Sequence, residues 1–289
     1  MSTWRVWLLA ARPPTLPASV VPVLVGTAAG SERGLRIAPF LAALVAALLI
    51  QIGTNLVNDV YDYRKKADTL ERLGPRRLIQ SGVATPGQVF GAACLCFVTA
   101  AFIGLYLIAV GGLPILVIGM LSITAGFAYT GGPWPLAYHG LGDLFVFIFF
   151  GPIAVLGSAY LQAGSTPATA IVASVPVGLL VTNILVVNNL RDLETDRAAG
   201  KRTLAVRLGR GSARLQYSAS TLLAFLVPLA LGAARNNLWL CLPLLTIPLG
   251  LRVIRMVNTQ TGPPLNAALK RTGQLHMVFG LLFAIGLWL

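Results

Sequence analysis

Nine stretches of about twenty apolar residues occupy most of this chain and limit its fold more than any other feature. A helix of about twenty residues crosses the roughly 30 Å hydrocarbon core of a bilayer. Backbone amides in that core must find partners within the protein, so such runs form helices. We therefore predict an all-α, polytopic membrane protein in which residues 1–289 form one domain of nine transmembrane helices. The stretches lie near residues 13–30, 37–57, 88–110, 113–131, 143–162, 168–188, 215–233, 238–257 and 272–289.

The first stretch follows Arg12, Pro13 and Pro14 and lacks a small-residue cleavage pattern, so we expect a retained helix rather than a removed signal peptide. Arg12 stands at its start. Two interpretations stay open for this residue: a contact for an anionic substrate, or an anchor near the lipid headgroups.

Basic residues indicate the orientation of the helices. With the amino terminus in the cytoplasm, 19 of the 22 Lys and Arg residues fall in cytoplasmic segments, an asymmetry that fits the positive-inside rule. Both acidic motifs described below then also face the cytoplasm. The net charge of +13 is thus a topology signal. We predict no nucleic-acid partner, because the basic residues flank helices and do not form a soluble basic domain.

The segment NNLRDLETDRAAGKR, residues 188–202, concentrates charge directly after an apolar run. Asn188, Asp192 and Asp196 recur every four residues, so they share one helix face if the preceding helix continues through them. Magnesium takes few protein carboxylates and completes its octahedron with water and phosphate oxygens. With Arg191 and Lys201 close by in the sequence, the stripe predicts a site for a metal-bound diphosphate.

A second motif, NDVYD at residues 58–62, repeats this spacing 130 positions earlier, also at the end of an apolar run. Asn58 and Asp62 correspond to Asn188 and Asp192. Asp59 has no acidic counterpart, so we do not expect it among the metal ligands. The repeat predicts two half-sites that face each other in one bundle.

Polar connections follow both motifs, near residues 63–87 and 189–214. Their length and mixed charge predict cytoplasmic lid loops over the site, although the second could also be an amphipathic surface element. Between the motifs, Tyr129 offers an aromatic face that could stabilise a cationic intermediate, and an interfacial aromatic belt would also place Tyr there. We expect Asp143 to cap the helix that begins near it.

These motifs resemble those of the UbiA superfamily of intramembrane aromatic prenyltransferases. The resemblance rests on Asn58, Asp62 and Asp68, on NNxRDxxxD at residues 188–196, and on GKRTLAVRLG at residues 200–209. ARPPTLPAS, ERLGPRRLIQSG, the LGDL and FFGP segments and LNAALKRTGQLHMVFGLL look like the branch that prenylates 1,4-dihydroxy-2-naphthoate for menaquinone biosynthesis. The likeness covers essentially the whole chain.

The resemblance implies a central cavity that is open to the cytoplasm and laterally to membrane lipids, in an integral protein of the bacterial cell membrane. It implies transfer of a polyprenyl group from polyprenyl diphosphate to the naphthoate, with loss of carbon dioxide and diphosphate. Asp62, Asp192 and Asp196 would be catalytic residues, and we add Tyr129 to them for the aromatic face noted above. Two Mg²⁺ ions would be held by six residues, and further residues would contact the diphosphate. The implied metal ligands are Asn58, Asp62, Asp68, Asn188, Asp192 and Asp196; the implied diphosphate contacts are Asn58, Asn188, Arg72, Arg191 and Lys201.

Other functions remain open at this point. A different aromatic acceptor, 4-hydroxybenzoate or homogentisate, would use the same motifs. A transporter would also show an internal repeat and ionisable residues in a helical bundle, but it would carry them near the middle of the membrane, whereas here they gather at helix ends.

Overall fold

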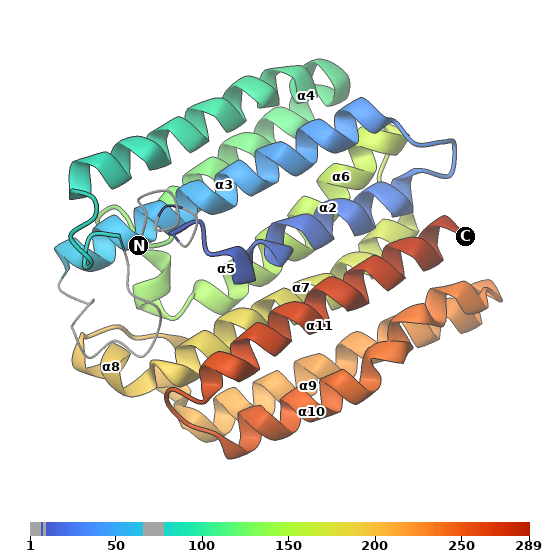
Figure 1. The fold of residues 1–289 in the computed structure, drawn as a ribbon. Helices are drawn as coiled ribbons and strands as arrows, with labels where there is room; N and C mark the ends of the chain where they lie inside the picture. Colours follow the sequence, from blue (N-terminus) through green and yellow to red (C-terminus); the bar gives the residue numbers. More distant parts are fainter. Residues whose placement is uncertain (1–6, 8–9, 66–77) are drawn as a thin grey trace.

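The computed structural model describes residues 7, 10–65 and 78–289, and these residues form helices and turns with no strands (Figure 1). The predicted all-α class is thereby confirmed for this part of the chain. The elements are η1 (Pro13–Thr15), α2 (Pro17–Gly30), α3 (Ile37–Arg64), α4 (Pro86–Ala128), η2 (Leu136–His139), α5 (Gly142–Ile148), η3 (Phe149–Ile153), α6 (Ala154–Ala163), α7 (Ala168–Arg191), α8 (Leu193–Ala198), α9 (Leu204–Arg235), η4 (Leu238–Thr246), α10 (Ile247–Thr259) and α11 (Leu265–Trp288).

Six helical segments of the described chain are long and apolar enough to cross a membrane. Two of them are composite, because α5, η3 and α6 run on as one segment and so do η4 and α10. The helices α2 and α11, which coincide with the predicted spans near 13–30 and 272–289, do not belong to the six. The six segments are Ile37–Arg64, Pro86–Ala128, Gly142–Ala163, Ala168–Arg191, Leu204–Arg235 and Leu238–Thr259.

Helix α4 contains a reversal of direction rather than one straight rod of 43 residues. Gly112 has φ 66° and ψ −151°, a conformation that residues with a β-carbon rarely adopt, and Pro114 follows it. Figure 1 shows the chain turning back after the first leg of α4. The two apolar runs predicted near 88–110 and 113–131 are therefore the two legs of α4.

Helix α7 forms the centre of the bundle. In the most apolar stretch of α7, 72% of the residues are buried. In the corresponding stretch of α4 the share is 17%, so most of the surface of α4 faces outward from the bundle. Val177 and Leu180 of α7 pack in the largest core cluster with residues of α2, α9 and α11, including Phe279. Helix α2 approaches α6 closely at Gly26. A β-carbon at this position would lie only 2.2 Å from the carbonyl oxygen of Val155.

Both acidic motifs lie at the same end of the bundle, where α3 ends and α7 gives way to α8 (Figure 1). The second predicted lid, near 189–214, is mostly helical: it contains α8 and the first turns of α9, which bends at Gly209 (φ 83°). Thr203 caps α9 by accepting a hydrogen bond from the amide of Val206, which explains why the helix starts there. The first predicted lid, near 63–87, falls largely outside the described residues.

Candidate active site

The first motif lies on the last two turns of α3, where Asn58 and Asp62 are buried and project from one face because they are four residues apart. The Thr130 hydroxyl donates a hydrogen bond of 2.5 Å to Asn58 Oδ1. The Tyr138 hydroxyl donates one of 2.7 Å to Asp62 Oδ1. Hydroxyl groups from the segment that follows α4 therefore hold the first motif in place.

The second motif differs from the continuous helix that its spacing suggested. Helix α7 ends at Arg191 and α8 begins at Leu193, with Asp192 at the break (φ −92°, ψ 9°). Hydrogen bonds of the helical type nevertheless cross the break: the Asp192 amide donates to Asn188 O at 3.1 Å, and the Asp196 amide donates to Asp192 O at 2.8 Å. The side chains of Asn188, Asp192 and Asp196 therefore still line the same cavity.

Arg191 is hydrogen-bonded to residues of the second motif but does not itself line the cavity. Its Nε donates to Asp192 Oδ1 at 2.7 Å, and its Nη2 donates to Asn188 Oδ1 at 2.9 Å. Nη1 donates at 2.9 Å to Asn266 Oδ1 of α11. Arg191 was predicted to contact phosphate oxygens or acids; in this geometry it donates to the acid Asp192, to Asn188 and to Asn266, and a contact with the diphosphate stays a prediction.

Lys201 joins the two motifs. Its Nζ lies 3.2 Å from Asp62 Oδ1 and 3.8 Å from Asp196 Oδ1, so one ammonium group faces an acid from each motif. The same Nζ lies 5.0 Å from the centroid of the Tyr138 ring. The backbone strengthens this junction, because the Arg202 amide donates to the Tyr138 carbonyl at 3.1 Å.

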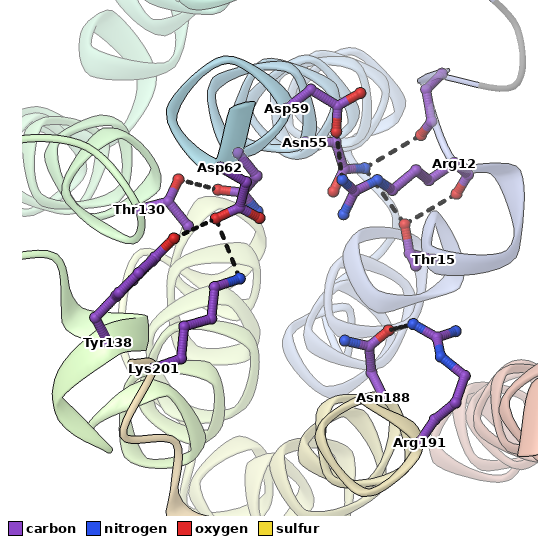
Figure 2. Close-up of polar contacts among 12 residues, drawn as sticks. Arg12, Thr15, Asn55, Asp59, Asp62, Thr130, Tyr138, Asn188, Arg191 and Lys201 are labelled. Carbon is purple, nitrogen blue, oxygen red and sulfur yellow. Dashed lines mark hydrogen bonds and ion pairs between the residues drawn. The ribbon is translucent and has the colours of Figure 1, made fainter. Parts of the chain in front are cut away.

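One cavity collects these groups. Its empty space, mouth included, is about 1310 Å³. In Figure 2 the group of Asp62, Tyr138 and Lys201 lies apart from Arg12 and Asp59, with Asn188 and Arg191 on the opposite helix. The polar residues of its wall are Arg12, Thr15, Gln51, Thr54, Asn55, Asn58, Asp62, Tyr129, Thr130, Asn188, Asn189, Asp192, Thr195, Asp196, Lys201 and Thr203.

A second, apolar pocket, whose empty space with its mouth included is about 690 Å³, shares part of its wall with this cavity. Phe149 and Phe150, which line it, belong to the π-helical turn η3, where Pro152 leaves a backbone carbonyl without its usual helical donor. The two spaces have Gln51, Thr54, Tyr129, Val146 and Phe150 in common. Tyr129 thus stands at the border between a polar chamber and an apolar one.

Burial lowers the pKa of the Lys65 amine, which lies just beyond the end of α3, against the opposing effect of Asp62.

The carboxylate and amide oxygens of the cavity wall are of the type that magnesium prefers. Within residues 7, 10–65 and 78–289, no three acidic, histidine or cysteine side chains lie close enough to hold a metal alone. A site of one or two carboxylates per ion, completed by amide oxygens, water and substrate phosphate, is how magnesium is usually bound. Asp68 and Arg72, the remaining predicted site residues, lie outside the described residues.

Arg12 is also in the wall of the cavity, on the far side from Lys201, and its guanidinium is paired with Asp59. Asp59 itself does not line the cavity, in keeping with its exclusion from the predicted ligands. Asp143 is not the capping residue that was expected: it lies inside the first turn of α5 and accepts a hydrogen bond from Gln216.

Sequence reasoning missed Thr130 and Tyr138. Both are uncharged and follow an apolar helix, and a Tyr in such a place is also typical of a membrane interface. Their partners are 72 and 76 residues away in the chain, so no local pattern connects them to the motif.

Comparison with known proteins gives the chain a family. The UbiA prenyltransferase family matches residues 19–276. The 1,4-dihydroxy-2-naphthoate octaprenyltransferase of Escherichia coli is 39% identical, over 100% of this chain and 97% of that protein. The protein of the same name from Mycobacterium tuberculosis is 37% identical, over 98% of this chain and 97% of its own length.

Solved structures show the same fold. A UbiA homologue from Archaeoglobus fulgidus, bound to DMAPP and Mg²⁺, superposes with a TM-score of 0.69 over 98% of this chain and 99% of that chain. Its sequence is 12% identical, so this likeness concerns the fold alone.

Proposed function

Because the chain belongs to the UbiA prenyltransferase family, we propose that it transfers a polyprenyl group from polyprenyl diphosphate to 1,4-dihydroxy-2-naphthoate. The products are demethylmenaquinol, diphosphate and carbon dioxide. The observation that carries the proposal is the meeting of both acidic motifs at Lys201, in a polar cavity that borders an apolar pocket.

The proposed arrangement in the membrane has nine crossings. The six long apolar segments supply six, the reversal of α4 at Gly112 makes its two legs separate crossings, and α2 and α11 complete the number. The 19 basic residues on the side of the motifs support a cytoplasmic active site and amino terminus, in a bacterial cell membrane.

The site is proposed to take two Mg²⁺ ions together with the donor diphosphate. The residues that would hold them are Asn58, Asp62, Asp68, Asn188, Asp192 and Asp196. Bound there, Mg²⁺ would neutralise charge that develops on the departing diphosphate. Lys201 adds a fixed positive charge between Asp62 and Asp196, and Arg72 is proposed as a further phosphate contact. Arg191 is proposed to act through Asn188 and Asp192, whose orientation it fixes.

The reaction breaks the donor's C–O bond, and the electron pair leaves with the diphosphate. The allylic carbon becomes cationic beside Tyr129, whose ring is neutral and can stabilise positive charge with its π face. The electron-rich ring carbon that carries the acceptor's carboxylate then forms the new C–C bond. Carbon dioxide leaves, and its bonding pair returns to the ring.

The apolar pocket suits the prenyl tail. Its wall, which includes Phe145, Phe149 and Phe150, excludes water that would otherwise quench the allylic cation. We propose that this pocket leads laterally towards lipid, because its walls are formed by residues of helices that carry the outward-facing apolar surface of the protein, including α4.

Acceptor identity tests the proposal. Purified protein, magnesium and a polyprenyl diphosphate should convert 1,4-dihydroxy-2-naphthoate to a product lighter than the simple adduct by the mass of carbon dioxide. Mass spectrometry of parallel reactions with 4-hydroxybenzoate and homogentisate gives the comparison. Efficient prenylation of 4-hydroxybenzoate, with none of the naphthoate, would replace the proposed acceptor.

Topology provides a second prediction. In a background that lacks Cys94, Cys96 and Cys241, single cysteines at the exposed positions Ser81 and Ala198 should react with a membrane-impermeant maleimide only from the cytoplasmic side. A cysteine at Ser165, on the connection between α6 and α7, should react only from the outside. Opposite labelling of Ser81→Cys and Ala198→Cys would rule out a shared cytoplasmic site.

A further inference from the structure

Arg12 adopts a backbone conformation that its side chain makes unfavourable. Its φ is 54° and its ψ 64°, in the left-handed region, and Asn236 is the only other non-glycine residue with positive φ in the described part of the chain. Such a residue persists where the surrounding structure fixes it, and these positions concentrate at functional sites.

Several hydrogen bonds fix the turn around Arg12. Its carbonyl accepts from the Thr15 amide at 2.8 Å and from the Thr15 hydroxyl at 2.9 Å. Asn55, a buried residue of α3, donates from Nδ2 to Ala11 O at 3.2 Å and to Thr15 Oγ1 at 3.3 Å. The buried amide of α3 thus holds a backbone carbonyl before Arg12 and the side-chain hydroxyl of Thr15 after it (Figure 2).

Asp59 holds the side chain of Arg12 in place, and Asn55 holds the turn in which Arg12 lies. The two lie one turn apart on α3, and Arg12 Nη2 donates to Asp59 Oδ1 at 2.5 Å. The Asp59 side chain is 2% exposed, whereas the Arg12 side chain is 28% exposed and lines the cavity. A guanidinium has five N–H donors, so this pairing leaves donors for a ligand in the cavity.

Charge in the cavity is divided between two places. Among its described lining residues, Arg12 and Lys201 are the two cations. Lys201 is engaged by Asp62 and Asp196, the acids proposed to hold the metal-bound diphosphate. Arg12 lies apart from that group, on the side of η1 and α2 (Figure 2).

The proposed reaction brings two anions into this cavity, the diphosphate and the carboxylate of the acceptor. A carboxylate that loses its water needs a cation with matching hydrogen-bond donors, and a guanidinium offers the fork geometry for it. We infer, resting on the proposed function, that Arg12 binds the carboxylate of the aromatic acceptor and that Asp59 is the residue that positions Arg12.

A selectivity ratio tests this inference. The measured quantity is kcat/KM for 1,4-dihydroxy-2-naphthoate divided by kcat/KM for 1,4-dihydroxynaphthalene, which has the same ring without the carboxylate. In Arg12→Gln the ratio should fall roughly 10- to 100-fold, the usual worth of a hydrogen bond to a charged group. The KM for polyprenyl diphosphate should stay within about twofold. Asp59→Asn should lower the ratio in the same direction by less, since Arg12 keeps its charge and loses its orientation.

Arg210→Gln is the matched control. The Arg210 side chain is 29% exposed and ion-paired with Glu194, much as Arg12 is 28% exposed and paired with Asp59, but Arg210 does not line the cavity. Its selectivity ratio should equal that of the unaltered protein.

Direct binding separates this inference from the reaction itself. With magnesium and donor left out, 1-hydroxy-2-naphthoate should bind Arg12→Gln more weakly than the unaltered protein, and 1-naphthol should bind both equally, as measured by fluorescence titration. If Arg12→Gln lost the same affinity for ligands with and without a carboxylate, the inference would be overturned. It would also be overturned if the only change were a rise in the KM for polyprenyl diphosphate. If the unaltered protein fails to prenylate the naphthoate, the proposed function fails instead.

Discussion

Replacing Asp62 or Asp192 by Asn should lower turnover by roughly 10²- to 10³-fold, the scale on which loss of one group that stabilises transition-state charge is felt. Each substitution keeps the size of the side chain and removes one negative charge from a separate half-site of the same cavity. Because one missing ligand already disables a unit that works as a whole, the double variant should lose much less than the product of the two single losses. The measurement is steady-state turnover of the two single variants and the double variant as a function of magnesium concentration.

A purely structural role for these acids would give another result. Asp192 accepts two hydrogen bonds from Arg191, so its loss could instead destabilise the end of α7. Thermal unfolding recorded on the same preparations separates the two roles. Glu194→Gln is the matched control, since Glu194 lies on α8 between Asp192 and Asp196 but is exposed, and pairs outward with Arg197 and Arg210. Near-normal turnover in a stable Asp192→Asn protein would remove Asp192 from the site.

Lys201→Gln should reduce kcat by about 100-fold, because its ammonium group contacts an acid from each motif and, in the proposed reaction, would face the charge that grows on the departing diphosphate. The same change leaves Asp62 and Asp196 without this counterion, so magnesium should bind the substrate-free protein at least as tightly as before. Isothermal titration with magnesium and single-turnover kinetics give the two quantities.

Lys65→Gln serves as the comparison for Lys201. Lys65 Nζ also lies over the Tyr138 ring, at 4.2 Å, and donates to the Thr130 carbonyl, but it does not line the cavity. A small loss in kcat is expected. If Lys65→Gln and Lys201→Gln reduced kcat equally, the lysines would act through the packing of Tyr138 and not through the substrate.

The sequence predicted the helical fold and the two motifs well, because both depend on patterns within a few turns of helix. Twenty apolar residues must form a helix in lipid, and an Asn and an Asp four residues apart must share a face. The spacing of Asn188, Asp192 and Asp196 even survived a helix break that it did not predict, since the hydrogen bonds between i and i−4 continue through Asp192.

The sequence did not predict which individual side chains from distant segments would contact one another. Arg191 stands beside two predicted ligands in the sequence, but nothing in the sequence pointed to its hydrogen bond with Asn266 of α11, 75 residues away. Asp59 has no acidic counterpart in the second motif, so the sequence suggested no role for it. In the structure its carboxylate accepts a hydrogen bond from Arg12, 47 residues away. In both cases the partner is fixed by tertiary packing.

The apolar pocket that shares a wall with the polar cavity limits how far this protein can select a donor by the length of its prenyl tail. The apolar pocket is open at its mouth and is not a closed chamber, so its walls do not enclose the whole of a long prenyl tail. The rest of a long tail must lie outside the pocket, where lipid accepts it without regard to its length. The number of isoprene units in the quinone would then be decided by whichever synthase supplies the diphosphate, and a cell could change its quinone length without altering this enzyme.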